Sequence, residues 1–253
     1  EGVDYLASHS LNTMILSVNI AARMDYATQE IVELCYGALL HDIGMLRIPS
    51  VIRNKTTALS EIERRAVERH PSLGLDFLPQ IRRIPASTML VIVQENERLD
   101  GSGYPRQIKA RRLHPFTRIV QLAAAYDAMT QRRPFAEAQH PYFAMADLLK
   151  QTHDGKFDGM PMRALLETLS LFPIGSGVRL SDGRAGYTLD ASGREFTRPV
   201  VLIDRDRDGT PLSATQVLDL QHMANVEAKI IEAVAPHIRK PLVDVATIEE
   251  FAL

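Results

Sequence analysis

Apolar residues recur at helical spacing through most of the first 172 residues. Intervals of three and four, which mark one buried face of a helix, separate Leu11, Ile15, Val18 and Ala22 in the first segment. The same spacing in the second segment connects Ile31, Leu34, Cys35, Ala38 and Leu39. Further helices are predicted at 60–70, 86–98, 116–131, 142–152 and 161–171. The first 172 residues therefore predict an all-helical bundle.

Several helix boundaries carry recognisable signals. The second helix runs directly into the pair His41–Asp42. Ser60 and Glu63 have the spacing of a capping box, which predicts that a helix begins there. We expect that helix to end at His70, because a following proline, Pro71, disfavours helical geometry at the residue before it.

The pattern changes after Phe172. Apolar and polar positions alternate between residues 177 and 204, and Asp182–Gly183 provides a turn, which together predict a small β-meander. Helical spacing returns from Ser213 to His237. We therefore predict a mainly α fold in three parts, with a helical domain at 1–172, a β-meander extension at 173–212 and a C-terminal helix and tail at 213–253.

Composition narrows the possible functions. The chain has 253 residues, and its formal net charge of −2 argues against a nucleic-acid binder, which usually carries a basic surface. Cys35 is the only cysteine, so an intrachain disulfide is excluded, and a reducing, cytoplasmic environment is expected. No apolar run approaches the roughly 18 residues of a membrane helix, and no span is expected. Because the first residue is Glu1 rather than Met, we expect a piece of a longer protein.

Polar residues with metal-binding chemistry lie on the predicted helices. His9 is on the first helix, His41 and Asp42 end the second, and His70 ends another. Ligands from separate helices can converge in the core of a bundle, so this set is a candidate metal site. The alternative is a hydrogen-bonded core network kept for packing, because buried polar groups must be satisfied even without a metal.

Several motifs in order resemble a known family. The segments "HDIGMLRIPSVIRNK", "ERHPSLG" and "DGSGYPRQIKARRLHPFTRIVQLAAAYDAMTQRRPF" are similar to the HD-GYP family, a branch of the HD phosphohydrolases that hydrolyses cyclic di-GMP in bacterial signalling. The segment "FPIGSGVRLSDGRAG" resembles the strands that follow in that family. The resemblance implies an HD-type helical bundle in which two or three ions, often iron or manganese, activate a water for attack on phosphorus.

The family's metal ligands are only partly present. By this resemblance, His9, His41, Asp42 and His70 match ligand positions. The family's two consecutive histidines are replaced by Glu95 and Asn96, and its aspartate on the alanine-rich helix by Ala124. Tyr5 stands where some members have a glutamate, and Met45 where a phosphate-facing lysine is usual.

These losses predict no full di-metal centre. The expected cofactor is none, or one weakly bound iron or manganese ion among His41, Asp42 and His70, with Glu95 supplying an oxygen. His9 also remains in the candidate metal set. No catalytic residue is assigned beyond the remnant pair His41–Asp42.

The second half of the family signature is intact. It forms a predicted tight turn that binds a nucleotide or a partner and consists of Asp100, Gly101, Gly103, Tyr104 and Pro105. Behind it stand five cations, Arg106, Lys109, Arg111, Arg112 and Arg118, which form either a solvated face or a phosphate-attracting surface. Arg133 matches a phosphate-contacting arginine of the family, whereas the next basic position is Ala136.

Three functional hypotheses follow. The first is a degenerate signalling module of cyclic di-GMP pathways that binds the nucleotide or a partner, with a diguanylate cyclase (GGDEF-type) domain as the partner suggested by the family. The second is an active phosphodiesterase that forms pGpG or GMP with a reduced metal site. The third is a structural domain that transmits signals from an upstream sensor or receiver domain. A homodimer is left open.

Overall fold

The computed structural model describes residues 2–132, 137–191, 196–221 and 228–234, with the side chains of 2–4 left aside. The chain forms two compact units. The first comprises residues 1–139 and 151–164, and the second comprises 140–150 and 165–253. The boundary predicted at 172/173 stays a prediction. Most of the helix Pro141–His153 belongs to the second unit, although it lies before that boundary in the sequence.

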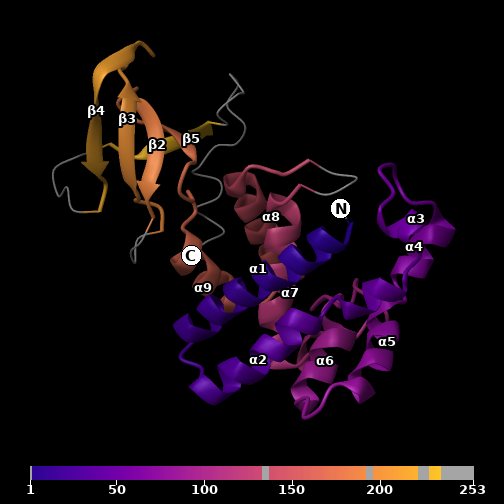
Figure 1. Cartoon of the computed structure of the whole chain (residues 1–253). Helices are drawn as coiled ribbons and strands as arrows, with labels where there is room; N and C mark the ends of the chain where they lie inside the picture. Colours follow the sequence, from indigo (N-terminus) through magenta and orange to yellow (C-terminus); the bar gives the residue numbers. More distant parts are fainter. Residues whose placement is uncertain (1, 133–136, 192–195, 222–227, 235–253) are drawn as a thin grey trace. The chain divides into compact units, whose positions relative to one another are not determined.

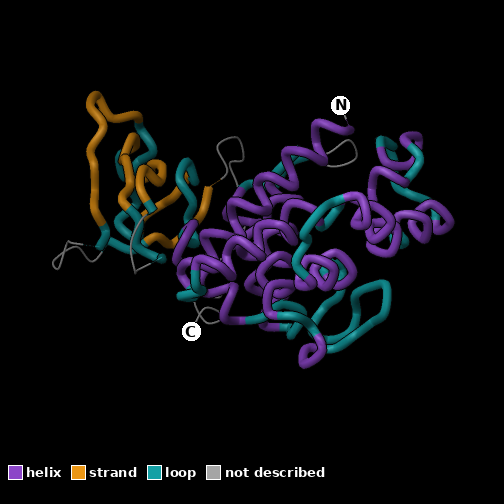
Figure 2. The backbone as a smooth tube through the Cα atoms, turned by 60° about the horizontal axis from the view of Figure 1, so that its bottom comes forward, coloured by secondary structure: helices purple, strands orange, loops and turns teal. Residues whose placement is uncertain are grey.

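The first unit consists mostly of helices, which are the purple segments in Figure 2. Its α-helices are α1 (Gly2–Arg23), α2 (Thr28–Leu40), α3 (Ser50–Arg53), α4 (Glu61–Val67), α5 (His70–Gly74), α6 (Ala86–Gln94) and α7 (Pro115–Thr130). Three short 3-10 helices accompany them, η1 (Ile43–Arg47), η2 (Leu75–Gln80) and η3 (Ala110–Arg112). α1 packs against α2 and α7, and α2 packs against α6 (Figure 1). The predicted helical bundle is confirmed.

The buried face of α1 differs from the predicted one. Leu11 and Ile15 are each 48% exposed, so the face predicted from their spacing is wrong. The buried positions include His9, Thr13 and Ile20. Apolar spacing alone selected the wrong face because three buried residues of α1, His9, Thr13 and Ser17, are polar. This orientation turns His9 into the interior.

The capping box at the start of α4 is confirmed. The Ser60 hydroxyl accepts a hydrogen bond from the Glu63 amide, and the Glu63 carboxylate accepts one from the Ser60 amide. The prediction that His70 ends a helix is wrong, because α4 ends at Val67 and His70 is the first residue of α5. Pro71 is tolerated there because the first turn of a helix does not use the proline's missing N–H.

The second unit contains a five-stranded antiparallel sheet with the strand order β4-β3-β2-β1-β5 (Figure 1). The strands are β1 (Gly177–Leu180), β2 (Ala185–Asp190), β3 (Val200–Arg205), β4 (Pro211–Asp219) and β5 (Ile230–Val234). The helices α8 (Pro141–His153) and α9 (Gly159–Leu169) precede the sheet in the sequence, and both run across the boundary between the units. The predicted meander is confirmed, including the turn at Gly183, whose φ is +92°.

The helix predicted at 213–237 is wrong over the described part. Residues 211–219 form β4, paired with β3, and residues 230–234 form β5, paired with β1. In β5, the buried Ile230 and Ala233 pair with Leu180 and Val178, and a register shift leaves the exposed Ile231 without a paired residue in β1. Periodicity could not separate the two possibilities, because short apolar runs fit either structure and the pairing of β5 with β1 is distant in sequence. Residues 235–253 lie outside the described part.

Among the described residues, no helix combines the length and the apolar character needed to cross a bilayer.

Candidate functional site

A cavity of about 310 Å³ lies within the first unit. Its walls come from α1, from the segment between α2 and η1, from η1, α3, α4 and α5, from the residues that follow α6, and from α7. The polar and charged residues that line it are Tyr5, His9, His41, Asp42, Arg53, Asn54, His70, Glu95, Asn96, Arg98 and Tyr104. The structure therefore brings together all five residues of the predicted metal set.

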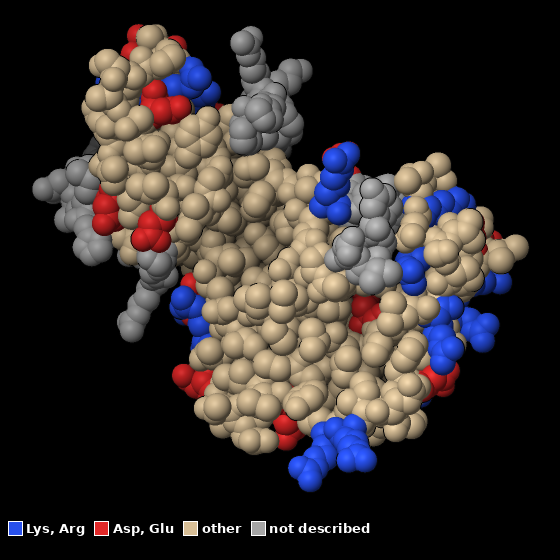
Figure 3. Space-filling model, viewed as in Figure 1, with Lys and Arg blue, Asp and Glu red and all other residues tan. Residues whose placement is uncertain are grey.

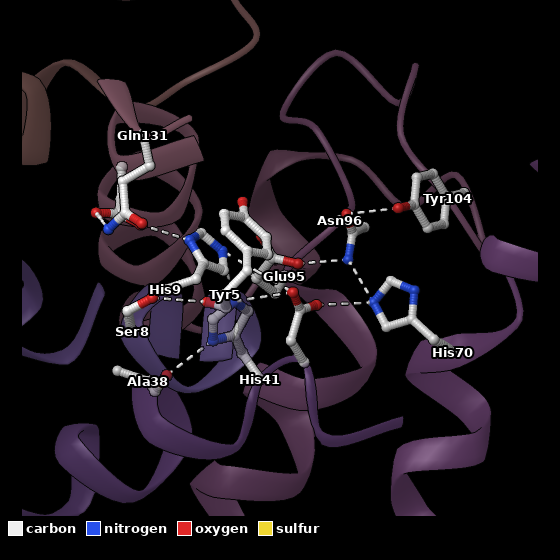
Figure 4. Close-up of polar contacts among 12 residues, drawn as sticks. Tyr5, Ser8, His9, Ala38, His41, His70, Glu95, Asn96, Tyr104 and Gln131 are labelled. Carbon is white, nitrogen blue, oxygen red and sulfur yellow. Dashed lines mark hydrogen bonds and ion pairs between the residues drawn. The ribbon is translucent and has the colours of Figure 1, made fainter. Parts of the chain in front are cut away.

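The three imidazoles are held in the same way, through Nδ1. His41 donates from Nδ1 to the Ala38 carbonyl at 2.8 Å, and His70 donates from Nδ1 to the Val67 carbonyl at 2.8 Å. His9 Nδ1 lies 2.6 Å from an oxygen of the Asp127 carboxylate. Each ring is thus held by its Nδ1, which leaves Nε2 facing the cavity (Figure 4). Such outer partners are what orients a histidine for metal binding.

Asp42 lies at the point where the imidazoles converge. Its Oδ1 is 3.1 Å from His70 Nε2, and its Oδ2 is 3.7 Å from His41 Nε2 and 3.9 Å from His9 Nε2. Burial alone would raise the pKa of Asp42, but the charge of His41 and the hydrogen bond to His70 outweigh it and hold that pKa well below its ordinary value. The carboxylate is therefore ionised and available as a shared ligand.

The pKa values of two of the histidines are shifted by neighbouring carboxylates. Burial would lower the pKa of His70, yet the hydrogen bond and charge of Asp42 raise it above 6.5. Burial would likewise lower the pKa of His9, yet the hydrogen bond to Asp127 and the charge of Asp42 raise it. Without a metal, the negative charge of the neighbouring carboxylates stabilises the protonated form of both rings.

Gly44 allows the close approach that places His70 beside Asp42. A Cβ at Gly44 would lie 1.9 Å from the main-chain oxygen of His70. Only glycine therefore lets η1 pack against the start of α5 at this distance. The sequence "HDIG" thus sets both the ligand pair and the contact that brings in the third histidine.

Asn96 lies among the groups that face the cavity. Its amide nitrogen donates to the Glu95 carboxylate and lies 3.2 Å from His70 Nε2. Its amide oxygen accepts a hydrogen bond of 2.7 Å from the Tyr104 hydroxyl. Burial raises the pKa of Tyr104, so this hydroxyl stays protonated and can donate. Figure 4 shows His70, Asn96 and Tyr104 as one connected row.

The donor atoms fall into two groups that share Asp42. One group is His9, His41 and Asp42, and the other is Asp42, His70 and Glu95, with the ligand atoms of each group within 4.8 Å of one another. Imidazole nitrogens and carboxylate oxygens suit iron, manganese or zinc. By donor chemistry, the residues present therefore fit a divalent cation. The grouping differs from the predicted single set, because His9 rather than His70 joins His41.

The wall formed by α7 offers no donor at the position where the family has an aspartate. Ala124 lines the cavity and is 4% exposed. Met45 also lines the cavity, so the position of the family's lysine carries no charge. Asp127, one turn further along α7, accepts from His9, Asn12 and Gln131 and supports the site from behind.

Of the predicted binding turn at residues 100–105, the side chain that lines the cavity is that of Tyr104. Gly101 has a φ of +87°, and a Cβ at Gly103 would lie 2.4 Å from the main chain of Glu97, so both glycines are needed for this turn. The Asp100 carboxylate accepts hydrogen bonds from the amide and hydroxyl of Ser102.

The rest of the loop is tied to the buried Glu97. The Glu97 carboxylate accepts hydrogen bonds from the amides of Arg106, at 2.7 Å, and Ile108, at 3.1 Å. The bond between Tyr104 and Pro105 is cis. These hydrogen bonds are internal to the loop and its support, and they do not show what the loop binds. Its binding role therefore stays a prediction.

The cationic run behind the loop is not part of the cavity lining. Arg118, for example, pairs with Asp158 at 2.7 Å and donates to the Ala110 carbonyl. The cations that do line the cavity are Arg53 and Arg98, which sequence reasoning missed. Arg53 lies within the family segment "HDIGMLRIPSVIRNK" but was not singled out, because its direction into the cavity is set by the fold. Arg133 falls outside the described residues.

A family model described as HD domain matches residues 6–160, more than half of the chain and nearly all of the first unit. The chain belongs to the HD domain family. The resemblance seen in the sequence is therefore confirmed. This HD domain contains the histidine–aspartate pair at His41 and Asp42, in the cavity described above.

Two curated relatives are cyclic di-GMP phosphodiesterases. The chain is 30% identical over 218 residues to cyclic di-GMP phosphodiesterase PA4108 of Pseudomonas aeruginosa, which covers 86% of this chain and 52% of the relative. It is 30% identical over 187 residues to cyclic di-GMP phosphodiesterase PdeB of Borreliella burgdorferi, covering 74% and 49%. The chain thus spans about half the length of these relatives.

A solved structure shares the fold. Bd1817, an HDG"Y"P protein from Bdellovibrio bacteriovorus, aligns with a TM-score of 0.54 at 21% identity, over 65% of this chain and 52% of that one.

Proposed function

We propose that this HD domain is a cyclic di-GMP signalling module that binds the nucleotide or a partner and lacks di-metal phosphodiesterase activity. Its site keeps the histidine and aspartate donors on one side of the cavity. On the other side fewer metal-binding atoms remain, and the Asn96 amide lies against two of them. Because nucleotide hydrolysis in this family depends on metal ions, the loss of metal-binding atoms affects catalysis.

The position of Asn96 carries this proposal. Its amide nitrogen donates to Glu95 and lies 3.2 Å from His70 Nε2, which the hydrogen bond to Asp42 already engages, so both groups that would face an ion have a hydrogen-bond partner. An amide nitrogen has no lone pair to offer a metal, and it occupies the Glu95 oxygen that would bind one. The group of Asp42, His70 and Glu95 is thereby satisfied as a hydrogen-bond network.

Ala124 weakens the opposite group. His9, His41 and Asp42 remain there as three donors, and the alanine methyl adds none. Two ions would have to share these few donors, with Asp42 common to both. A two-metal site needs its ions about 3.5–4 Å apart and enough ligands to hold each of them. The reduced set supports at most one.

Binding of a nucleotide is supported by the shape and relatives of the site. A cavity of about 310 Å³ is at the small end of ligand pockets, which measure roughly 300–1,000 Å³. The relatives named cyclic di-GMP phosphodiesterases supply the choice of nucleotide. A diguanylate cyclase (GGDEF-type) partner, an upstream sensor or receiver domain and a homodimer stay predictions from the sequence.

Calorimetric titration with cyclic di-GMP, run beside a chromatographic hydrolysis assay in iron and in manganese, tests the proposal. We expect binding without formation of pGpG or GMP. Metal-dependent turnover that persists across preparations, and that is lost with chelator, would overturn the proposal. A matched control is the double variant Asn96→His with Ala124→Asp, which returns two donors and should raise the metal content.

One observation favours a second candidate, a phosphodiesterase with a single ion. The Nε2 atoms of His9 and His41 are 3.3 Å apart and lie 3.9 and 3.7 Å from Asp42 Oδ2, so three donor atoms already face one point. A bound ion would supply Lewis acidity and a more acidic water. Turnover by the wild type that His41→Ala abolishes would support this candidate, and turnover unchanged in His41→Ala would exclude it.

A further inference from the structure

Arg53 reaches the cavity from the end of α3, and its position is fixed by one hydrogen bond. Its Nη1 donates to the Met45 carbonyl at 3.0 Å, so the guanidinium lies beside η1. Both Arg53 and Met45 line the cavity. The side chain is therefore held at the wall of the site by a contact that uses a single donor.

The remaining donors of Arg53 are not committed. A guanidinium carries five N–H groups in a planar fork. The Nε atom of Arg53 is buried and has no hydrogen-bond partner in the part of the chain that the structure describes, and no carboxylate there forms an ion pair with the residue. Because this Nε is closed to solvent, a ligand oxygen would instead reach the terminal nitrogens, of which Nη2 has no acceptor among the described residues.

Arg98, the other cation of the lining, is engaged differently. Its Nη1 donates to the carbonyls of Glu95 and Glu97, at 3.3 and 2.9 Å, and its guanidinium lies 4.9 Å from the centre of the Phe157 ring. These contacts fasten the turn after α6. Among the described cations of the lining, Arg53 is thus the less engaged one, with a single hydrogen bond, whereas Arg98 makes two and also packs over a ring.

The geometry points to Arg53 as the residue that binds a phosphate oxygen of the ligand in this cavity. Asp42 and Glu95 would repel an anion, so a phosphodiester needs a cation in the same cavity to offset them. The arginine fork suits two oxygens of one phosphate. On the face shown in Figure 3, Lys and Arg side chains gather over the part that carries α3, α4 and α5 in Figure 1, which favours approach of an anion from this side.

This inference rests on the proposed binding of cyclic di-GMP, and the test separates the two. Calorimetry with cyclic di-GMP in the presence of chelator compares wild type, Arg53→Met and Arg47→Met. Arg47 is a matched control, because it lies on η1 but packs over the Phe77 ring and does not line the cavity. Arg53→Met should weaken binding about 10- to 100-fold, the loss typical of a hydrogen bond to a charged group. Arg47→Met should stay within about threefold.

Two further variants guard against a folding defect. Arg53→Gln keeps a donor for the Met45 carbonyl and should lose affinity as Arg53→Met does. Adding Met45→Lys to Arg53→Met places a cation beside the lost one and should restore most of the affinity. If wild type binds but Arg53→Met and Arg53→Gln bind equally well, this inference is wrong and the proposed function stands. If wild type does not bind cyclic di-GMP, nucleotide binding and this inference both fail.

Discussion

Replacement of Asp127 tests how the site is supported from behind. The carboxylate is buried, with 6% of its side chain exposed. It accepts three hydrogen bonds, from His9 Nδ1 at 2.6 Å, Asn12 Nδ2 at 3.0 Å and Gln131 Nε2 at 2.8 Å. The pKa of His9 is raised in part by this carboxylate, so the pair has ionic character. Asp127→Ala removes the common acceptor of all three donors.

The expected cost follows from these contacts. Removing one partner of a buried ion pair costs about 3–5 kcal/mol, because the other group is left buried without compensation. His9 is 4% exposed, so water cannot readily replace the lost oxygen. We therefore expect Asp127→Ala to lower the free energy of unfolding by about 3–5 kcal/mol. Asp127→Asn keeps an acceptor oxygen and should cost less.

Urea denaturation followed by far-ultraviolet circular dichroism measures this loss, since the signal reports mainly on the helices. Asp76→Ala is the control, because Asp76 is exposed on η2 and its substitution should change the free energy of unfolding by no more than about 0.5 kcal/mol. A cost for Asp127→Ala below about 1 kcal/mol, or one equal to the control, would refute the reasoning that this carboxylate holds His9.

Three further predictions concern single side chains. Gly103→Ala should lower the free energy of unfolding by at least about 2 kcal/mol, because a Cβ there would lie 2.4 Å from the main chain of Glu97. Gly159→Ala is the control, because no atom lies near its Cβ position and the free energy of unfolding should not fall in this way. Equal losses for the two variants in urea denaturation would contradict the close approach at Gly103. Ser60→Ala should cost about 1 kcal/mol by removing the cap of α4, and an unchanged thermal midpoint would show that the cap contributes nothing. In chelated protein, the pKa of His70 is raised above 6.5, so its stabilisation is complete below that pH and is lost as the pH rises through the raised value. The stability difference between wild type and His70→Gln should therefore shrink from about pH 5.5 to about pH 8, and a growing difference would contradict this sign.

Local signals predicted the helical part of the fold well. The capping box at Ser60 and the second helix depend on residues close together in the chain, and both appear in the structure, although Leu39 of the predicted face is 45% exposed. β5 could not be found this way, because its partner β1 lies about 50 residues earlier and the pairing contains a register shift after Arg179. A strand that is defined by its partner leaves only a weak pattern in its own sequence.

The sequence predicted the site residues that lie in recognisable motifs. His41, Asp42 and His70 were named from the sequence and meet in one cavity, because Gly44 allows their segments to approach. The hydrogen-bond role of Asn96 was not predicted, since it depends on side-chain directions that only the fold sets. Arg53 was missed for the same reason.

Metal stoichiometry tests the central claim most directly. Protein purified with iron or manganese supplied throughout, and analysed by inductively coupled plasma mass spectrometry, reports the number of ions per chain. With Ala124 on one side and Asn96 on the other, the account predicts no more than about one equivalent of metal. Two equivalents bound tightly to the wild type would contradict it.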